Sequence, residues 1–129
     1  MHQEIDAELD AIARDVVDCA FVVHKALGPG LLESAYAICL GLEFTKRGIS
    51  FAAEVPMDVI YEQQRIESAY RLDFLVANRL VVELKSVEKL LPIHKAQVLT
   101  YLRLSGLRLG LLINFNAPLI RDGISRLVI

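Results

Sequence analysis

Apolar residues recur at steps of three and four along the first part of the chain, which is the spacing of one face of a helix. The set comprises Ile5, Leu9, Ile12, Val16, Cys19, Val23 and Ala26. It predicts an amphipathic helix of about five to six turns. The helix is expected to stop in the segment Leu27-Gly28-Pro29-Gly30, because glycine and proline end helices and form turns.

Two further helices are predicted. One begins near Leu31 and ends near Lys46-Arg47-Gly48, where cations in the last turn and a following glycine suit the helix dipole and the C-cap. Its apolar side carries Leu32, Ala35, Cys39 and Leu42. The other runs from about Ile93 to Leu104, after Pro92 and before Ser105-Gly106.

The middle and the end of the chain have the character of strands. Residues 49–61 predict a strand in which Pro56 marks an edge or a bulge. Residues 66–76 and 80–86 predict two more strands around a short turn. In the second of these, Leu80-Val81-Val82 is continuously apolar, which is typical of a central strand buried on both faces.

Residues 109–115 predict a further buried strand, and residues 124–129 are interpreted as a final edge strand. The order of elements is then two helices, three strands, one helix and one or two strands. This order predicts a mixed α/β (α+β) fold in which helices flank a mixed sheet.

Length and composition limit the class of protein. The chain has 129 residues, of which 54% are hydrophobic and 23% charged, so it is neither disordered nor of low complexity. Residues 1–129 are predicted to form one domain. The apolar content is high for this size, which favours burial against a second copy, as in a homodimer, or against a partner.

The net charge of −2, from 14 Lys and Arg against 16 Asp and Glu, excludes a nucleic-acid binder that relies on excess positive charge. A metal-dependent enzyme remains possible, because a carboxylate cluster itself adds negative charge. The candidate phosphate contacts are few and scattered: Lys25, Lys46, Arg47, Arg71, Lys89, Lys95 and Arg103.

The cellular compartment is inferred from the two cysteines and from the absence of targeting signals. Cys19 and Cys39 lie in helical patterns and are interpreted as free, buried thiols, and the absence of a CxxC pair argues against structural zinc. Residues 1–10 are acidic and polar, unlike a signal peptide. No run reaches the roughly 18 apolar residues of a membrane span. These features predict a cytoplasmic protein with no membrane partner.

The strongest chemical signal is Asp73 together with Glu83-Leu84-Lys85. Alternate side chains of a strand share a face, so Glu83 and Lys85 are presented together on a strand that otherwise looks buried. Charges at such a position are unfavourable unless they are paired or bind a metal. The alternative interpretation is a buried salt bridge between a carboxylate and the lysine, with no ligand.

The register between two strands decides whether Asp73 joins Glu83. A two-residue turn would pair Asp73 with Val82 or Leu84 and place the carboxylates on opposite faces. A three-residue connection over residues 77–79 pairs Val76 with Leu80, and Asp73 with Glu83. A single site therefore predicts that connection or a compensating bulge.

Two helices carry further polar candidates. His94, Gln97 and Tyr101 lie with Val98 on one face of the third helix, where they could bind a phosphate or orient the lysine; the alternative is a half-exposed helix face. Glu33 and Tyr36 share a face at the start of the second helix. An acidic residue in a first turn is favoured by the helix dipole in any case.

The motifs, taken in order, resemble the GxxExxY family within the PD-(D/E)XK nuclease superfamily. The resemblance covers about residues 10–129, although no proline precedes Asp73 where the motif name places one. It is carried by Gly30-x-x-Glu33-x-x-Tyr36, Tyr70-Arg71-Leu72-Asp73, Val82-Glu83-Leu84-Lys85, His94-Lys95-Ala96-Gln97-x-x-x-Tyr101 and Gly110-Leu111-Leu112-Ile113-Asn114-Phe115. It implies a restriction-endonuclease-like fold with a central mixed sheet of about four strands flanked by helices.

The resemblance also implies a metal site. Asp73 and Glu83 would bind a divalent ion, Mg²⁺ or Mn²⁺, and the backbone carbonyl of Leu84 could complete the shell. Glu33 would be an additional ligand or would hold a metal-bound water. Lys85 would position the attacking water and stabilise negative charge on the phosphate oxygens.

The remaining roles concern the substrate. Gln97 and Tyr101 match a helix motif that, in some branches of the superfamily, supports the lysine and contacts substrate. Tyr36 and His94 are assigned to substrate binding beside them.

Two functions are consistent with this set of residues. One is a metal-dependent nuclease acting on DNA or RNA. The other is a non-catalytic module that keeps the fold and binds nucleic acid or a protein partner, since a fold alone does not fix function.

Overall fold

The computed structural model describes residues 5–129; residues 1–4, the start of the acidic segment compared above with a signal peptide, lie outside that range. The elements in order are α1 (Ala7–Leu27), α2 (Glu33–Lys46), β1 (Phe51–Tyr61), β2 (Gln64–Val76), β3 (Leu80–Lys85), α3 (Pro92–Ser105), β4 (Leu109–Asn114), the 3₁₀ turn η1 (Ile120–Gly123) and β5 (Ile124–Val128). The predicted mixed α/β fold is confirmed.

The sheet has five strands in the order β1-β2-β3-β4-β5, one more than the roughly four that the family resemblance implied, and the final edge strand predicted at residues 124–129 is confirmed. The fifth is the segment near the C-terminus, which pairs antiparallel with β4. β3 and β4 are parallel, and α3 forms the crossover that a parallel pair requires. The expected central strand is confirmed, because Leu80, Val81 and Val82 are fully buried. Pro56 lies in β1, an edge strand, as predicted.

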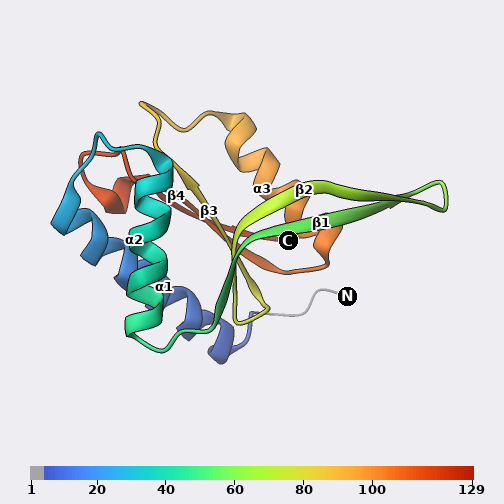
Figure 1. Ribbon diagram of the computed structural model, residues 1–129, viewed down its shortest axis with the longest axis horizontal. Coiled ribbons are helices and arrows are strands. Elements are labelled where there is room, and N and C mark those ends of the chain that lie inside the picture. The colour runs from blue at the N-terminus through green and yellow to red at the C-terminus, as the bar shows by residue number, and fades with distance from the viewer. Residues whose placement is uncertain (1–4) are drawn as a thin grey trace.

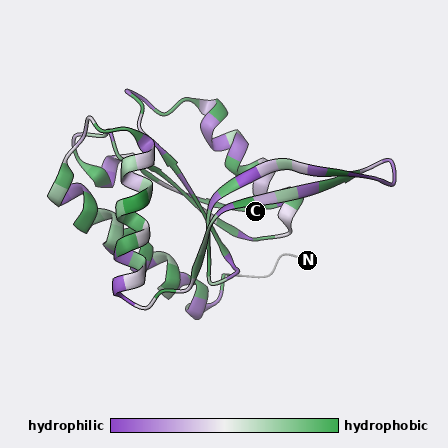
Figure 2. Cartoon of the chain, in the orientation of Figure 1, coloured by the Kyte–Doolittle hydropathy of each residue, from purple (hydrophilic) through white to green (hydrophobic). Residues whose placement is uncertain are grey.

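Helices cover both faces of the sheet (Figure 1). α1 and α2 pack on one face over a cluster that includes Phe74, Val82 and Leu111. α3 packs on the other face through Val98 and Leu102, against a second cluster. The central strands and the inner sides of α1 and α2 are dominated by apolar positions (Figure 2). Among residues 5–129, no helix is long and apolar enough to cross a lipid bilayer.

The ends of α1 follow the sequence signals. The Asp6 carboxylate accepts a hydrogen bond of 2.8 Å from the Leu9 amide and caps the helix start. Gly28 ends the helix with φ +69°, a conformation that glycine adopts without strain. α2 begins at Glu33, two residues later than expected, because the backbone of Leu32 is extended.

The outer halves of β1 and β2 form a two-stranded arm that projects away from the rest of the sheet (Figure 1). Glu62 and Gln63 make the turn at its tip with φ +49° and +63°. Such left-handed turn residues match the twist of the flanking strands. β2 therefore begins at Gln64, two residues earlier than the apolar pattern indicated.

We expect opposite effects from adding one methyl group at two glycines. A β-carbon at Gly41, inside α2, would lie 3.6 Å from Phe51, an ordinary contact, whereas one at Gly110, in β4, would lie 2.9 Å from Val98. Gly41→Ala should therefore stabilise the protein by roughly 0.5–1 kcal/mol through helix propensity. Gly110→Ala should destabilise it by roughly 1–3 kcal/mol through overpacking. Urea unfolding of both variants measures this, and a loss of stability in Gly41→Ala would contradict the open packing around α2.

Candidate functional site

The face that β2 presents to each helical layer changes at Asp73. Phe74 belongs to the cluster under α1 and α2, whereas Leu72, two residues away, belongs to the cluster under α3. A regular strand would place both on the same face. The neighbouring β1 changes faces at the same level, where Glu54 has φ +52°. Asp73 consequently lies at a twist between the two layers.

Asp73 and Glu83 meet at this twist. The predicted three-residue connection is confirmed, since Val76 pairs with Leu80. The backbone pairing of the two strands extends to Phe74 and Val82 but not to Asp73 and Glu83. Beyond Phe74 and Val82, hydrogen bonds between carboxylate side chains and backbone amides connect the two strands. The Asp73 amide donates to the Glu83 carboxylate at 2.8 Å, and the Leu84 amide donates to the Asp73 carboxylate at 2.8 Å.

The Glu83 carboxylate is only 5% exposed. Burial and the adjacent negative charge of Asp73 raise its pKa to about 8. Lys85 lies two residues along β3, is half-buried, and opposes this shift with its positive charge. Asp73, Glu83 and Lys85 therefore form one electrostatic cluster, as their spacing predicted.

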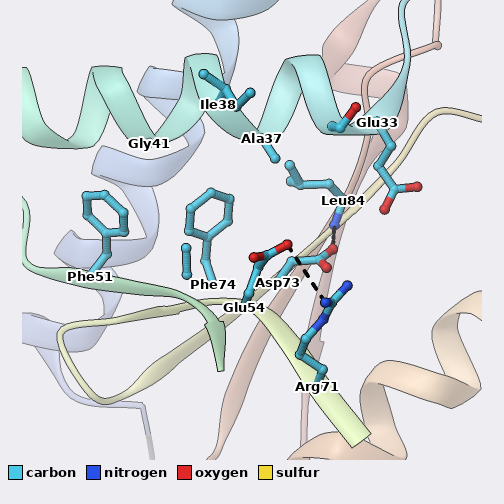
Figure 3. A pocket seen from close by; sticks show the side chains of 12 residues that line it. Glu33, Ala37, Ile38, Gly41, Phe51, Glu54, Arg71, Asp73, Phe74 and Leu84 are labelled. Atoms are coloured by element: carbon cyan, nitrogen blue, oxygen red, sulfur yellow. Dashed lines mark hydrogen bonds and ion pairs between the residues drawn. The ribbon is translucent and has the colours of Figure 1, made fainter. Parts of the chain in front are cut away.

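A groove of about 660 Å³ runs past this cluster between α2 and the first two strands. Glu33, from the first turn of α2, and Asp73 both line it (Figure 3). Desolvation and the Asp73 charge raise the pKa of Glu33, and Lys85 acts in the opposite direction. The structure thus brings Glu33 toward the Asp73 and Lys85 charges, where its role as a ligand was expected.

Tyr101 of α3 reaches the cluster from the other face of the sheet. Burial and the charges of Glu83 and Asp73 raise the pKa of its hydroxyl. Its ring stacks on Tyr70 with centroids 4.8 Å apart. Gln97 lies one turn earlier on the exposed side of α3.

His94 has a structural role that the sequence pattern did not indicate. Its Nδ1 accepts a hydrogen bond of 3.0 Å from the Leu91 amide, which caps the start of α3. Capping therefore occupies one ring nitrogen. Substrate binding through the other ring nitrogen stays a prediction.

The expectation that Tyr36 binds substrate is wrong. Its side chain is fully buried and stacks on Phe115 with ring centroids 4.8 Å apart. Its hydroxyl donates to the Gly28 carbonyl at 2.6 Å and accepts from the Leu31 amide at 3.1 Å. These bonds hold the turn between α1 and α2, so Tyr36 positions the start of α2, which carries Glu33.

Sequence reasoning missed the groove residues on its far side. Gly41, Phe51 and Glu54 line the same groove as Asp73. Gly41 comes from a helix and the other two come from a strand, so no single repeat in the sequence relates them. Arg71 is one of several scattered cations in the sequence and belongs to the motif that ends at Asp73, but neither feature places it in a groove. The stacking partner of Tyr101, Tyr70, lies three residues before Asp73, and no local spacing relates these two aromatic residues.

The oxygen donors fit a hard divalent cation. Mg²⁺ typically takes one or two carboxylates and completes its shell with waters and substrate phosphates. Asp73 and Glu83 supply such a pair. The hydrogen bonds from backbone amides go to one oxygen of each carboxylate, Asp73 Oδ2 and Glu83 Oε1. The part of the chain that the structure describes contains no group of three His, Cys, Asp or Glu side chains gathered as metal ligands. The fit therefore rests on the two-carboxylate pair.

Comparison with known proteins identifies one family. A family model described as the PD-(D/E)XK nuclease superfamily matches residues 10–127. Comparisons with curated proteins and with solved structures return no match.

Removing the Glu83 charge should stabilise the metal-free protein at alkaline pH. Its folded pKa of about 8 exceeds the ordinary 4.5, so the associated stability is complete below about pH 4.5 and is lost as pH rises through about 8. Glu83→Gln keeps an acceptor for the Asp73 amide and removes this loss. We expect it to exceed the wild type by a few kcal/mol near pH 9 and to approach it near pH 5, measured by urea unfolding in chelator.

The matched control is Glu67→Gln, which changes an exposed carboxylate on the same strand as Asp73. Its stability difference from the wild type should be small and independent of pH. An equal gain in both variants, or a Glu83→Gln gain that does not vary with pH, would contradict the buried carboxylate pair.

Proposed function

The chain belongs to the PD-(D/E)XK nuclease superfamily, and we propose that it is a metal-dependent nuclease that hydrolyses phosphodiester bonds in DNA or RNA. The observation that carries the proposal is the buried Glu83 carboxylate, which lies beside Lys85 and beside Asp73, a residue that lines an open groove. Strongly shifted carboxylates beside a charged partner in a cleft are typical of functional sites. The motifs further favour the GxxExxY family.

Asp73 and Glu83 would hold the divalent ion, Mg²⁺ or Mn²⁺, with the Leu84 carbonyl near them. When bound, the ion supplies a polarised water and neutralises charge on the phosphodiester. A cation beside Glu83 favours its ionised form and so offsets the raised pKa. Glu33 would add a further acidic ligand or hold a water from the α2 side of the groove.

Lys85 is assigned the role of stabilising the negative charge that develops on the phosphate oxygens. Lys85 is half-buried, and a fixed positive charge in a partly buried site acts more strongly than in bulk water. Gln97 and Tyr101 are assigned to the α3 side of the substrate. The Tyr101 ring, fixed by stacking on Tyr70, orients its hydroxyl near the carboxylate pair.

A non-catalytic module is the second candidate function. The observation that favours it is that the Asp73 and Glu83 carboxylates both bond backbone amides and thereby extend the β2–β3 pairing. A retained structural role of this kind would keep both residues in a protein that only binds nucleic acid or a partner.

Metal titration and a cleavage assay distinguish the two functions. We expect calorimetry to show Mg²⁺ or Mn²⁺ binding by the wild type and its loss in Asp73→Asn, which keeps an acceptor for the Leu84 amide. Lys85→Ala should still bind the metal but should lose about a hundredfold or more in cleavage rate, because a stabilising charge is removed.

Two comparisons keep this test interpretable. Glu67→Gln, an exposed change on β2, should match the wild type in metal binding and cleavage. Unfolding curves establish that each variant is folded. Metal binding without cleavage of any single- or double-stranded DNA or RNA substrate would contradict the nuclease and favour the module.

We also propose that the protein forms a homodimer, since two copies present two sites to a nucleic acid. Exposed apolar side chains support a contact surface on α1 (Phe21, Val22 and Leu27) and on the projecting arm (Ile60, Tyr61 and Ile66). Sedimentation should give a dimer at tens of micromolar. Phe21→Glu should shift the protein to monomer if α1 forms the interface, and Ile60→Glu should do so if the arm forms it. A wild-type monomer would contradict the proposal.

A further inference from the structure

The groove beside the carboxylates has a second, apolar end that the proposed chemistry does not use. Glu33 and Asp73 lie at one end, and Ala37, Ile38, Gly41, Phe51 and Phe74 line the other (Figure 3). Both ends belong to one cavity of about 660 Å³, which is the size of small-molecule sites. A ligand held at Asp73 can therefore extend into the apolar end.

An aromatic cluster fixes the floor of this apolar end. The rings of Phe51 and Phe74 lie 5.7 Å apart in an edge arrangement, and Phe44 packs against both at 5.3 and 5.4 Å. Phe44 and Phe74 are buried, whereas Phe51 is half-buried and lines the groove. Phe51 thus offers a rigid aromatic surface to a flat ligand.

Gly41 keeps this end of the groove open. It lies inside a helix, where glycine is less favourable than alanine. A β-carbon there would point at the rings of Phe51 and Phe74 from 3.6 to 3.8 Å, so neither the backbone nor the packing excludes a side chain. A methyl group at this position would be in ordinary contact with both rings, so a larger side chain would have to occupy the apolar end of the groove.

Arg71 lies at the rim of the same groove. Its ion pair with Glu54 is long, 3.8 Å, and both side chains are largely exposed, so the pair is weak. The guanidinium is therefore free to contact a phosphate that follows the groove. The groove combines a cationic rim, an aromatic floor and a carboxylate pair.

We propose that the apolar end binds one unpaired nucleobase next to the phosphate that a metal ion at Asp73 and Glu83 would hold, so that the substrate is a single-stranded stretch of nucleic acid. The inference rests on the proposed nuclease function. A base stacks on aromatic side chains in a sequence-tolerant way. A paired base within a duplex cannot enter such a pocket unless it is flipped out. The apolar end therefore selects unpaired strands.

Binding tests the inference without cleavage when Lys85→Ala is used as the background with Mg²⁺ present. The probes are fluorescent oligonucleotides of about 12 nucleotides, in DNA and RNA, single-stranded and paired with their complements. A second set carries 2-aminopurine, or an abasic nucleotide, at each position in turn. Gly41→Leu fills the apolar end, and Gly41→Ala is the matched control that leaves most of it open.

We expect single strands to bind at least roughly tenfold more tightly than duplexes, the effect of one stacked base. Gly41→Leu should remove this preference, whereas Gly41→Ala should retain it. One 2-aminopurine position should change its fluorescence on binding to the background protein but not to Gly41→Leu. An abasic nucleotide at that position should weaken binding as much as Gly41→Leu, with no further loss when the two are combined.

The outcomes separate this inference from the nuclease. The inference is overturned if single strands and duplexes bind equally, or if folded Gly41→Leu binds single strands as the background protein does. This holds even if the parent protein, which retains Lys85, cleaves nucleic acid. Binding of single strands that depends on Gly41, in a parent protein that cleaves nothing, supports base binding and contradicts hydrolysis. Absence of nucleic-acid binding overturns both.

Discussion

The burial of one carboxylate beside another is the constraint on which the rest of the site depends. Glu83 lies in the buried stretch of β3, residues 80–84, and the negative charge of Asp73 faces it. Two such groups are tolerated only where protons, amides or cations offset their repulsion. Here the Asp73 and Leu84 amides donate to them, and the charge of Lys85 lies nearby. A bound metal cation would complete that compensation, as the proposed function requires.

The twist of β2 makes this pair accessible. Leu72 and Phe74 pack on opposite sides of the sheet, so the residue between them, Asp73, is shared by both helical layers. Glu33 can then approach from α2, and Tyr101 from α3. Neither helix would reach a carboxylate at the centre of a flat, regular sheet. On the neighbouring strand, Glu54 adopts a positive φ, so this geometry is accompanied by local backbone strain.

The chain has a net charge of −2, so its affinity for nucleic acid cannot come from a general positive field. The groove has other sources of binding energy. On the proposed function, a metal at the carboxylates, the Arg71 side chain and the aromatic floor would each contact a different part of a nucleotide. Such a site would recognise a single strand through local contacts, whereas a duplex binder typically has an extended basic surface.

The sequence by itself determined where the helices and strands lie, how β2 connects to β3, and which charged side chains come together at Asp73 and Glu83. Apolar periodicity acts over a few residues, so it located every helix and strand to within about two residues. The three-residue connection at 77–79 pairs Val76 with Leu80, and this register brings the Asp73 amide within hydrogen-bond distance of the Glu83 carboxylate. Alternation along β3 placed Lys85 with Glu83. These features depend on neighbours in the chain, which the sequence displays directly.

Tertiary packing decided the rest. Tyr36 and Glu33 share a helix face, yet packing against Phe115 buries the tyrosine and leaves the glutamate at the groove. His94 caps its own helix through its ring Nδ1. The groove joins residues of α2, β1, β2 and β3. Contacts between distant segments depend on how whole faces pack, and no local period encodes that.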